Sequence, residues 1–142
     1  MNLLLIPLGP RGNRLYRTAS FDPENDRPVE QEPTQAPADA VLIVDGTFLQ
    51  RPELRDGWDL TIFVETSTVT AERRAFGRDA EQSGGVDAVQ RLHAERYRGA
   101  FDLYERLCAP EEIADVVLTN EDFERPEMLI RPDCLVASSQ SP

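Results

Sequence analysis

Lysine is absent from this chain: all 15 basic residues are arginines, set against 26 aspartates and glutamates in 142 residues. The net charge of −11 argues against a nucleic-acid-binding protein, which needs a basic surface. An acidic chain without lysine is typical of a genome rich in G and C. It also fits a protein kept soluble at high salt, because net charge governs solubility.

Cysteine and histidine are scarce. Cys108 and Cys134 do not form a CxxC motif, and His93 is the only histidine, so neither a zinc site nor a disulfide framework is indicated. We expect both cysteines to be small buried hydrophobic residues in a reducing cytosol.

Long hydrophobic runs are also missing. No run approaches the roughly 20 residues that a membrane span needs. The first seven residues (MNLLLIP) have no basic segment and no small-residue cleavage site, so they do not resemble a secretory signal. We therefore expect a cytoplasmic protein without membrane contact, built as one globular domain or a piece of one.

The most prominent apolar run is residues 39–46 (DAVLIVDG). Its β-branched residues predict a strand over residues 40–45, buried on both faces of a parallel sheet. Ligands of such sheets bind beyond the carboxyl ends of the strands, so Asp45 would face a binding crevice. The alternative is a buried strand that stops at an ordinary Asp-Gly turn.

Further strands and helices are predicted along the chain. A short helix is expected at 51–55, a buried strand near 58–65, a helix capped by Thr66 or Ser67 that runs to about Ala80, a long helix over 86–108 and strands at 114–120 and 128–130. Strands that alternate with helices predict an α/β fold with a parallel sheet. The domain is expected to cover residues 1–136, followed by a disordered tail at 137–142.

Two groups of residues could carry chemistry. Arg74 and Arg78 lie four apart on one helix face, a spacing that suits phosphate binding or an ordinary solvated surface. Phe21, Asp22 and Arg27 follow a weak strand; they could contact a base and a sugar, or form a hairpin with a charged loop.

The order of these patterns resembles the uridine kinase family of P-loop kinases, especially the uridine-kinase-like proteins of bacteria and archaea. The resemblance covers about residues 4–130. The motifs that carry it are, in chain order, RTASFD, Arg27, VLIVDG, RPEL, WDLTIFVET, RRAFGRD, the Arg96-Tyr97 helix and ADVVLTN.

The resemblance implies roles for individual residues. Asp45 matches the acidic end of the Walker B strand and would act around Mg²⁺, and Arg74 and Arg78 match the lid helix near the phosphates. Phe21, Asp22 and Arg27 match the nucleoside-binding segment; the missing histidine before Arg27 leaves the identity of the nucleoside open. Mg²⁺ and ATP or GTP are the implied cofactors.

The family's first strand and its GxxxxGK[ST] loop have no counterpart here, and a chain without lysine cannot supply the phosphate-binding lysine of that loop. We expect an incomplete P-loop NTPase-like fold in which the strands at 40–45 and 60–65 keep open edges. Another chain or a second copy could pair with such an edge.

Three functions remain open at this point. The chain could be the C-terminal part of a uridine kinase-like phosphotransferase, inactive alone, that transfers the γ-phosphoryl of ATP or GTP to a nucleoside or similar hydroxyl. It could instead be a non-catalytic nucleoside-binding or regulatory module derived from such a kinase. An unrelated α/β protein is the third possibility.

Overall fold

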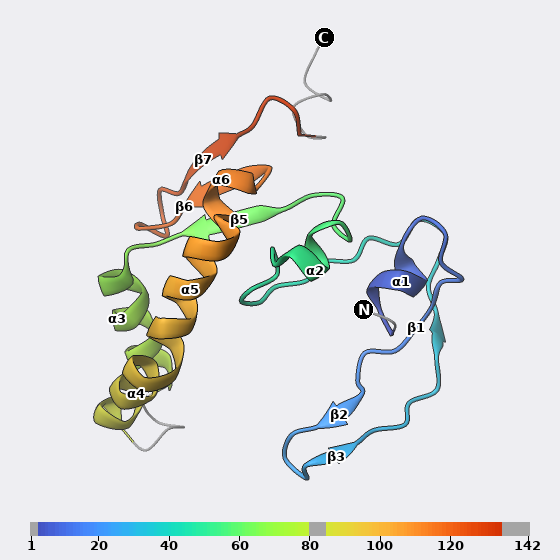
Figure 1. Ribbon diagram of the computed structural model, residues 1–142, viewed down its shortest axis with the longest axis horizontal. Helices are drawn as coiled ribbons and strands as arrows, with labels where there is room; N and C mark the ends of the chain where they lie inside the picture. Colours follow the sequence, from blue (N-terminus) through green and yellow to red (C-terminus); the bar gives the residue numbers. More distant parts are fainter. Residues whose placement is uncertain (1–2, 80–84, 135–142) are drawn as a thin grey trace. The chain divides into compact units, whose positions relative to one another are not determined.

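The computed structural model describes residues 3–79 and 85–134, and it is a mixed α/β structure (Figure 1). The chain divides into two compact units. The first comprises Met1–Leu49 and Glu53–Gly57, and the second comprises Gln50–Pro52 and Trp58–Pro142. The predicted tail at 137–142 and the predicted helix end at Ala80 lie outside the described residues.

The first unit contains short elements only. They are α1 (Leu5–Leu8), β1 (Leu15–Tyr16), β2 (Phe21–Asp22), β3 (Arg27–Pro28) and β4 (Thr34–Gln35). Strand β1 pairs antiparallel with β4, and β2 pairs antiparallel with β3. The short helix α2 (Pro52–Arg55), predicted at 51–55, is confirmed and spans the boundary between the two units.

Hydrogen bonds hold the first unit together more than apolar packing does. The carbonyl oxygen of Leu3 accepts a bond of 2.8 Å from the N–H of Arg17. The side-chain oxygen of Gln31 accepts bonds from the N–H groups of Thr18 (2.9 Å) and Ala19 (3.1 Å). Among the described hydrophobic residues of this unit, Ala36 alone is buried.

The prediction of a strand at residues 40–45 is wrong. This segment is irregular backbone, and the side chains of Val41 and Ile43 are 84% and 88% exposed. A β-branched run becomes a buried strand only where neighbouring strands satisfy its backbone groups, and none of the described strands pairs with it. The turn expected at Asp45-Gly46 is displaced as well: the observed turn covers residues 47–50.

The second unit contains a three-stranded sheet and several helices. Its elements are β5 (Ile62–Glu65), α3 (Thr68–Asp79), α4 (Val86–Leu92), the π-helix η1 (His93–Tyr97), α5 (Arg98–Cys108), α6 (Pro110–Ile113), β6 (Val116–Thr119) and β7 (Glu127–Ile130). The strand order is β5-β6-β7, with β5 parallel and β7 antiparallel to β6. The predicted parallel pairing is therefore confirmed for one strand pair, within a small mixed sheet.

The central strand β6 carries the core of this unit, since Val116 and Val117 are buried. A side chain fixes its register against β5. The carboxylate of Asp115 accepts bonds of 2.7 Å from both the N–H and the hydroxyl of Thr61, and the N–H of Asp115 donates to that hydroxyl. Strand β5 itself is shorter and more exposed than the predicted strand near 58–65, because it lies at an edge of the sheet.

The helix predicted over residues 86–108 is confirmed as one continuous helical stretch, with a π-helical turn between α4 and α5. It ends at Cys108: Ala109 adopts a left-handed conformation (φ 43°), and Pro110 begins α6. On α5, Cys108 is buried, whereas Leu107 is 70% exposed. Across the described residues, no helix has the length and apolarity that a membrane crossing requires.

Candidate functional site

The first cluster of polar groups lies at the carboxyl ends of the parallel strands β5 and β6. The hydroxyl of Thr119 donates to the carboxylate of Glu65 (2.8 Å), and the N–H of Asn120 donates to the carbonyl oxygen of Glu65 (2.8 Å). Helix α3 begins three residues after β5 ends. Ligands of α/β sheets bind at this edge of the sheet, so the side chains around it are candidate functional groups.

Helix α3 has two caps at its first turn. The hydroxyl of Ser67 accepts a bond of 3.3 Å from the N–H of Thr70, so Ser67 is the N-cap of the two candidates, Thr66 and Ser67, that the sequence offers. The carboxylate of Glu121 accepts a bond of 2.7 Å from the N–H of Ser67. Hydrogen bonding from the Ser67 side chain, followed by that from Thr70, holds the pKa of Glu121 below its ordinary value, and the charge of Arg74 adds to this effect.

Arg74 extends from α3 to the segment that follows β6. Its two terminal nitrogens donate to the carbonyl oxygens of Asn120 (2.8 Å) and Glu121 (2.9 Å). The centre of its guanidinium lies 3.8 Å from the centroid of the Phe123 ring. Arg74, the predicted lid-helix residue, is therefore at the carboxyl edge of the sheet, where it already has protein partners.

Arg78, predicted to act together with Arg74, lies one turn further along α3, and its side chain is exposed. Both residues belong to the second unit, whereas Asp45 belongs to the first. Asn120, Glu121 and Phe123 were not predicted as site residues. They lie 46 or more positions from Arg74, and no local pattern signals contacts over such a separation.

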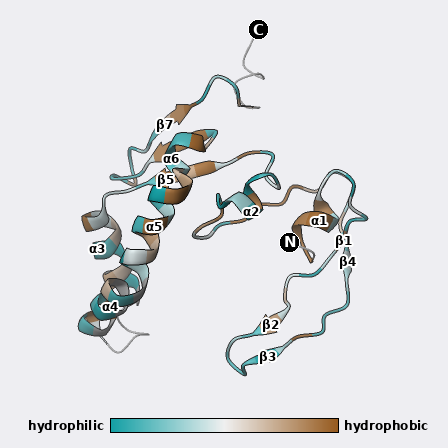
Figure 2. Cartoon of the chain, in the orientation of Figure 1, coloured by the Kyte–Doolittle hydropathy of each residue, from teal (hydrophilic) through white to brown (hydrophobic). Residues whose placement is uncertain are grey.

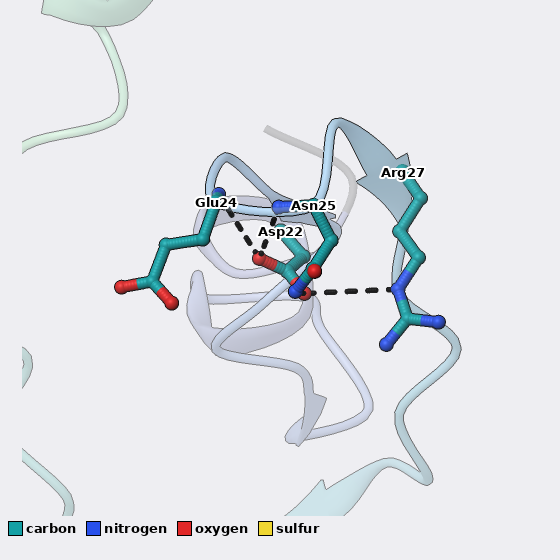
Figure 3. A network of polar contacts seen from close by, with 4 residues as sticks. All are labelled: Asp22, Glu24, Asn25 and Arg27. Atoms are coloured by element: carbon teal, nitrogen blue, oxygen red, sulfur yellow. Dashed lines mark hydrogen bonds and ion pairs between the residues drawn. The ribbon is translucent and has the colours of Figure 1, made fainter.

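The second cluster is the β2–β3 hairpin of the first unit (Figure 3). The carboxylate of Asp22 accepts bonds from the N–H of Glu24 (3.1 Å), the N–H of Asn25 (3.2 Å) and the side-chain amide of Asn25 (2.7 Å). The Nε of Arg27 lies 3.7 Å from the same carboxylate. Hydrogen bonding from the Asn25 side chain is the main reason why the pKa of Asp22 lies below its ordinary value.

The structure thus brings Phe21, Asp22 and Arg27 together, as predicted, but in the form of the alternative, a hairpin with a charged loop. The carboxylate of Asp22 accepts the backbone hydrogen bonds that close the turn. The Phe21 side chain is 50% exposed and the Arg27 side chain is 70% exposed. The groups that remain open to a ligand here are an aromatic ring and a guanidinium, which suit a base and an anionic or carbonyl group.

Asp45, the predicted metal-associated carboxylate, is exposed in the irregular segment that replaces the predicted strand. In the described residues, no group of three or more histidine, cysteine, aspartate or glutamate side chains is arranged to hold a metal ion. A single carboxylate is still compatible with Mg²⁺, which often binds through one carboxylate together with water and substrate phosphates. The role of Asp45 stays a prediction.

Comparison of the chain with protein-family models, with curated proteins and with solved structures found no match.

Proposed function

We propose that this chain belongs to a uridine kinase-like phosphotransferase, with a P-loop NTPase-like ancestry for its sheet. The reaction would move the γ-phosphoryl group of ATP or GTP to a hydroxyl of a nucleoside or a similar small molecule. The supporting observation is the position of Arg74 at the carboxyl ends of the parallel strands β5 and β6. A guanidinium at that edge suits the charge that develops on a transferring phosphoryl group.

The other predicted residues take roles in keeping with their surroundings. Arg78, exposed on the same helix as Arg74, would add positive charge near the phosphates. Asp45 would hold Mg²⁺ with the help of the phosphates themselves. In the hairpin, the Phe21 ring would stack on the base and Arg27 would bond to the nucleoside, while Asp22 keeps the turn closed.

Phosphoryl transfer by P-loop kinases needs a lysine at the β- and γ-phosphates of the nucleotide. These 142 residues contain none, so a phosphate-binding loop would have to come from another segment or another polypeptide. We therefore expect the chain alone to bind nucleoside without turnover.

The test combines a binding assay with a phosphotransfer assay. Purified chain is titrated with uridine, cytidine, adenosine and guanosine by calorimetry, and then incubated with Mg²⁺, ATP or GTP and each nucleoside, at low and at high salt. We expect saturable binding of at least one nucleoside, a loss of binding in Arg27→Gln, and no turnover. Arg55→Gln, at an exposed arginine outside the hairpin, is the matched control.

The outcomes separate the proposals. Turnover that disappears in Asp45→Ala would overturn the need for an external phosphate-binding loop. If the chain shows neither nucleoside binding nor turnover, the proposal that its function derives from a uridine kinase-like protein would be overturned.

The second candidate is a non-catalytic nucleoside-binding or regulatory module. It is favoured by the bonds that already occupy Arg74 and Asp22, because both charged groups stabilise the protein itself. Adding a separately produced P-loop segment of a uridine kinase-like protein distinguishes the two: restored turnover supports the phosphotransferase, and binding that never leads to turnover supports the module.

A further inference from the structure

Two Asp-Gly pairs occur in the chain, Asp45-Gly46 and Asp56-Gly57, and all four residues are exposed. In such a pair the backbone nitrogen of the glycine can attack the carboxyl carbon of the aspartate side chain. Glycine favours this attack because it has no side chain to hinder the approach and because its backbone turns easily. The rate then depends on how firmly the surrounding structure holds that nitrogen.

The first pair, Asp45-Gly46, lies on irregular backbone. Residues 41–46 form neither helix nor strand, and Figure 2 shows their hydrophobic part as a coil that leads toward α2. Within the part of the chain that the structure describes, no hydrogen bond engages the N–H of Gly46 or the carboxylate of Asp45. Exposed backbone without hydrogen bonds changes conformation at little cost in free energy, so this nitrogen can reach the carboxyl carbon.

The second pair, Asp56-Gly57, lies in the turn that follows α2. The N–H of Gly57 donates a hydrogen bond of 2.9 Å to the carbonyl oxygen of Leu54, at the end of that helix. The nitrogen of Gly57 must give up this bond, and the turn must open, before it can attack the carboxyl group of Asp56. The two pairs therefore share their chemistry and their exposure but differ in backbone restraint.

We propose that Asp45 is a site of spontaneous isomerisation to isoaspartate, and that the turn after α2 protects Asp56 from the same reaction. The nitrogen of Gly46 forms a bond to the side-chain carboxyl carbon of Asp45, and its proton leaves with the carboxyl OH as water. Water then opens the resulting succinimide ring. Opening at the side-chain carbonyl restores aspartate, whereas opening at the main-chain carbonyl produces isoaspartate.

Isomerisation changes the backbone and not the net charge. The chain then runs through the Cβ atom of residue 45, which lengthens it by one carbon atom, and a free carboxylate is left on the Cα atom. This exposed α-carboxylate is the group that S-adenosylmethionine-dependent isoaspartyl methyltransferases recognise, so an enzyme of this class is the partner that the product fits. The reaction needs only the chain and water, and it does not depend on the proposed phosphoryl transfer.

Incubation of the purified chain in heavy-oxygen water tests the proposal, because each passage through the succinimide adds one heavy oxygen atom. Peptide mass spectrometry assigns the label to a residue, and fragmentation distinguishes isoaspartate from aspartate. We expect label at Asp45 to appear roughly two- to tenfold faster than at Asp56, as the loss of one hydrogen bond implies. In urea, where the turn after α2 unfolds, the two rates should converge.

Two variants that keep the charge of each site serve as a matched pair. Asp45→Glu should abolish isoaspartate at this position, because the longer side chain would have to close a larger ring, and should leave the rate at Asp56 unchanged. Asp56→Glu is the control and should leave the rate at Asp45 unchanged. Circular dichroism checks that both variants are folded. Methyl transfer from labelled S-adenosylmethionine by an isoaspartyl methyltransferase should rise with incubation time, and should rise less in Asp45→Glu than in Asp56→Glu.

Three results would overturn the proposal. The first is a folded chain without label at Asp45 over an interval in which the chain in urea becomes labelled at both sites. The second is labelling of the folded chain at Asp56 as fast as at Asp45, or faster. The third is a difference between the two sites that persists unchanged in urea, because the sequence and not the structure would then set the rates.

Discussion

At the scale of single residues, the Arg74 guanidinium is held by the carbonyl oxygens of Asn120 and Glu121. Bonds from a charged donor to two backbone acceptors tie α3 to the segment after β6, and the Phe123 ring covers the guanidinium. A ligand that draws Arg74 toward itself must first replace these bonds. The same residue therefore contributes to stability and stays available to an anion that competes well for it.

Arg74→Ala should lower the free energy of unfolding by about 1.5–3 kcal/mol, the usual range for hydrogen bonds that involve a charged group. Urea unfolding followed by circular dichroism measures the change. Arg73→Ala is the control, because Arg73 is its exposed neighbour on α3. Equal stability of the two variants would contradict the structural role of Arg74.

Glu121 should make stability depend on pH. Its pKa in the folded protein lies below the ordinary value of about 4.5, so its contribution is fully present above that value and is lost as the pH falls through the lowered pKa. We expect the stability difference between the unmodified chain and Glu121→Gln to be greatest near neutral pH and to shrink in acid. Glu124→Gln, which removes an exposed carboxylate nearby, is the matched control.

At the scale of elements, the β2–β3 hairpin depends on a side chain rather than on its two short pairs of strand residues. The carboxylate of Asp22 accepts hydrogen bonds from the backbone N–H groups of Glu24 and Asn25 and from the Asn25 side chain. It also forms an ion pair with Arg27 across the strands. Two residue pairs alone are too few for a stable hairpin. The Asp22 carboxylate is therefore the main support of this turn.

Asp22→Ala should abolish the cross-strand contacts between Phe21 and Pro28 in nuclear Overhauser spectra, because the turn loses its acceptor. Glu24→Ala should keep them, since Glu24 contributes only its backbone N–H to the turn. Signals of the β5–β6 pair should be unchanged in both variants. Cross-strand contacts that persist in Asp22→Ala would show that the turn closes without the carboxylate.

At the scale of the whole molecule, the elements that sequence patterns predicted well are those fixed by local signals. The Ser67 cap begins α3, the Ala109-Pro110 pair ends α5, and the apolar run before Asn120 forms β6. Residues 40–45 have an equally strong apolar pattern, yet they form no strand, because a strand also needs neighbours that the pattern does not contain.

The residues of the candidate site likewise divide into those that a local sequence signal predicts and those that only non-local contacts bring together. The hairpin that holds Phe21, Asp22 and Arg27 follows from a short turn sequence, DPEN, in which aspartate accepts bonds from the backbone two and three residues on. The partners of Arg74 were not predictable, because α3 and the segment after β6 meet only once the sheet has formed. Non-local contacts of this kind leave no periodic signal in the sequence.

The bond between Thr61 and Asp115 joins residues 54 positions apart, and this separation has a consequence for synthesis. A ribosome needs roughly 3–11 seconds to add that many residues, at about 5–20 residues per second. During that interval β5 has emerged without β6, so both of its backbone edges, and not one, are exposed to other nascent chains. The vulnerable form of this protein is therefore the half-made one, and chaperones that bind extended apolar segments would meet it there first.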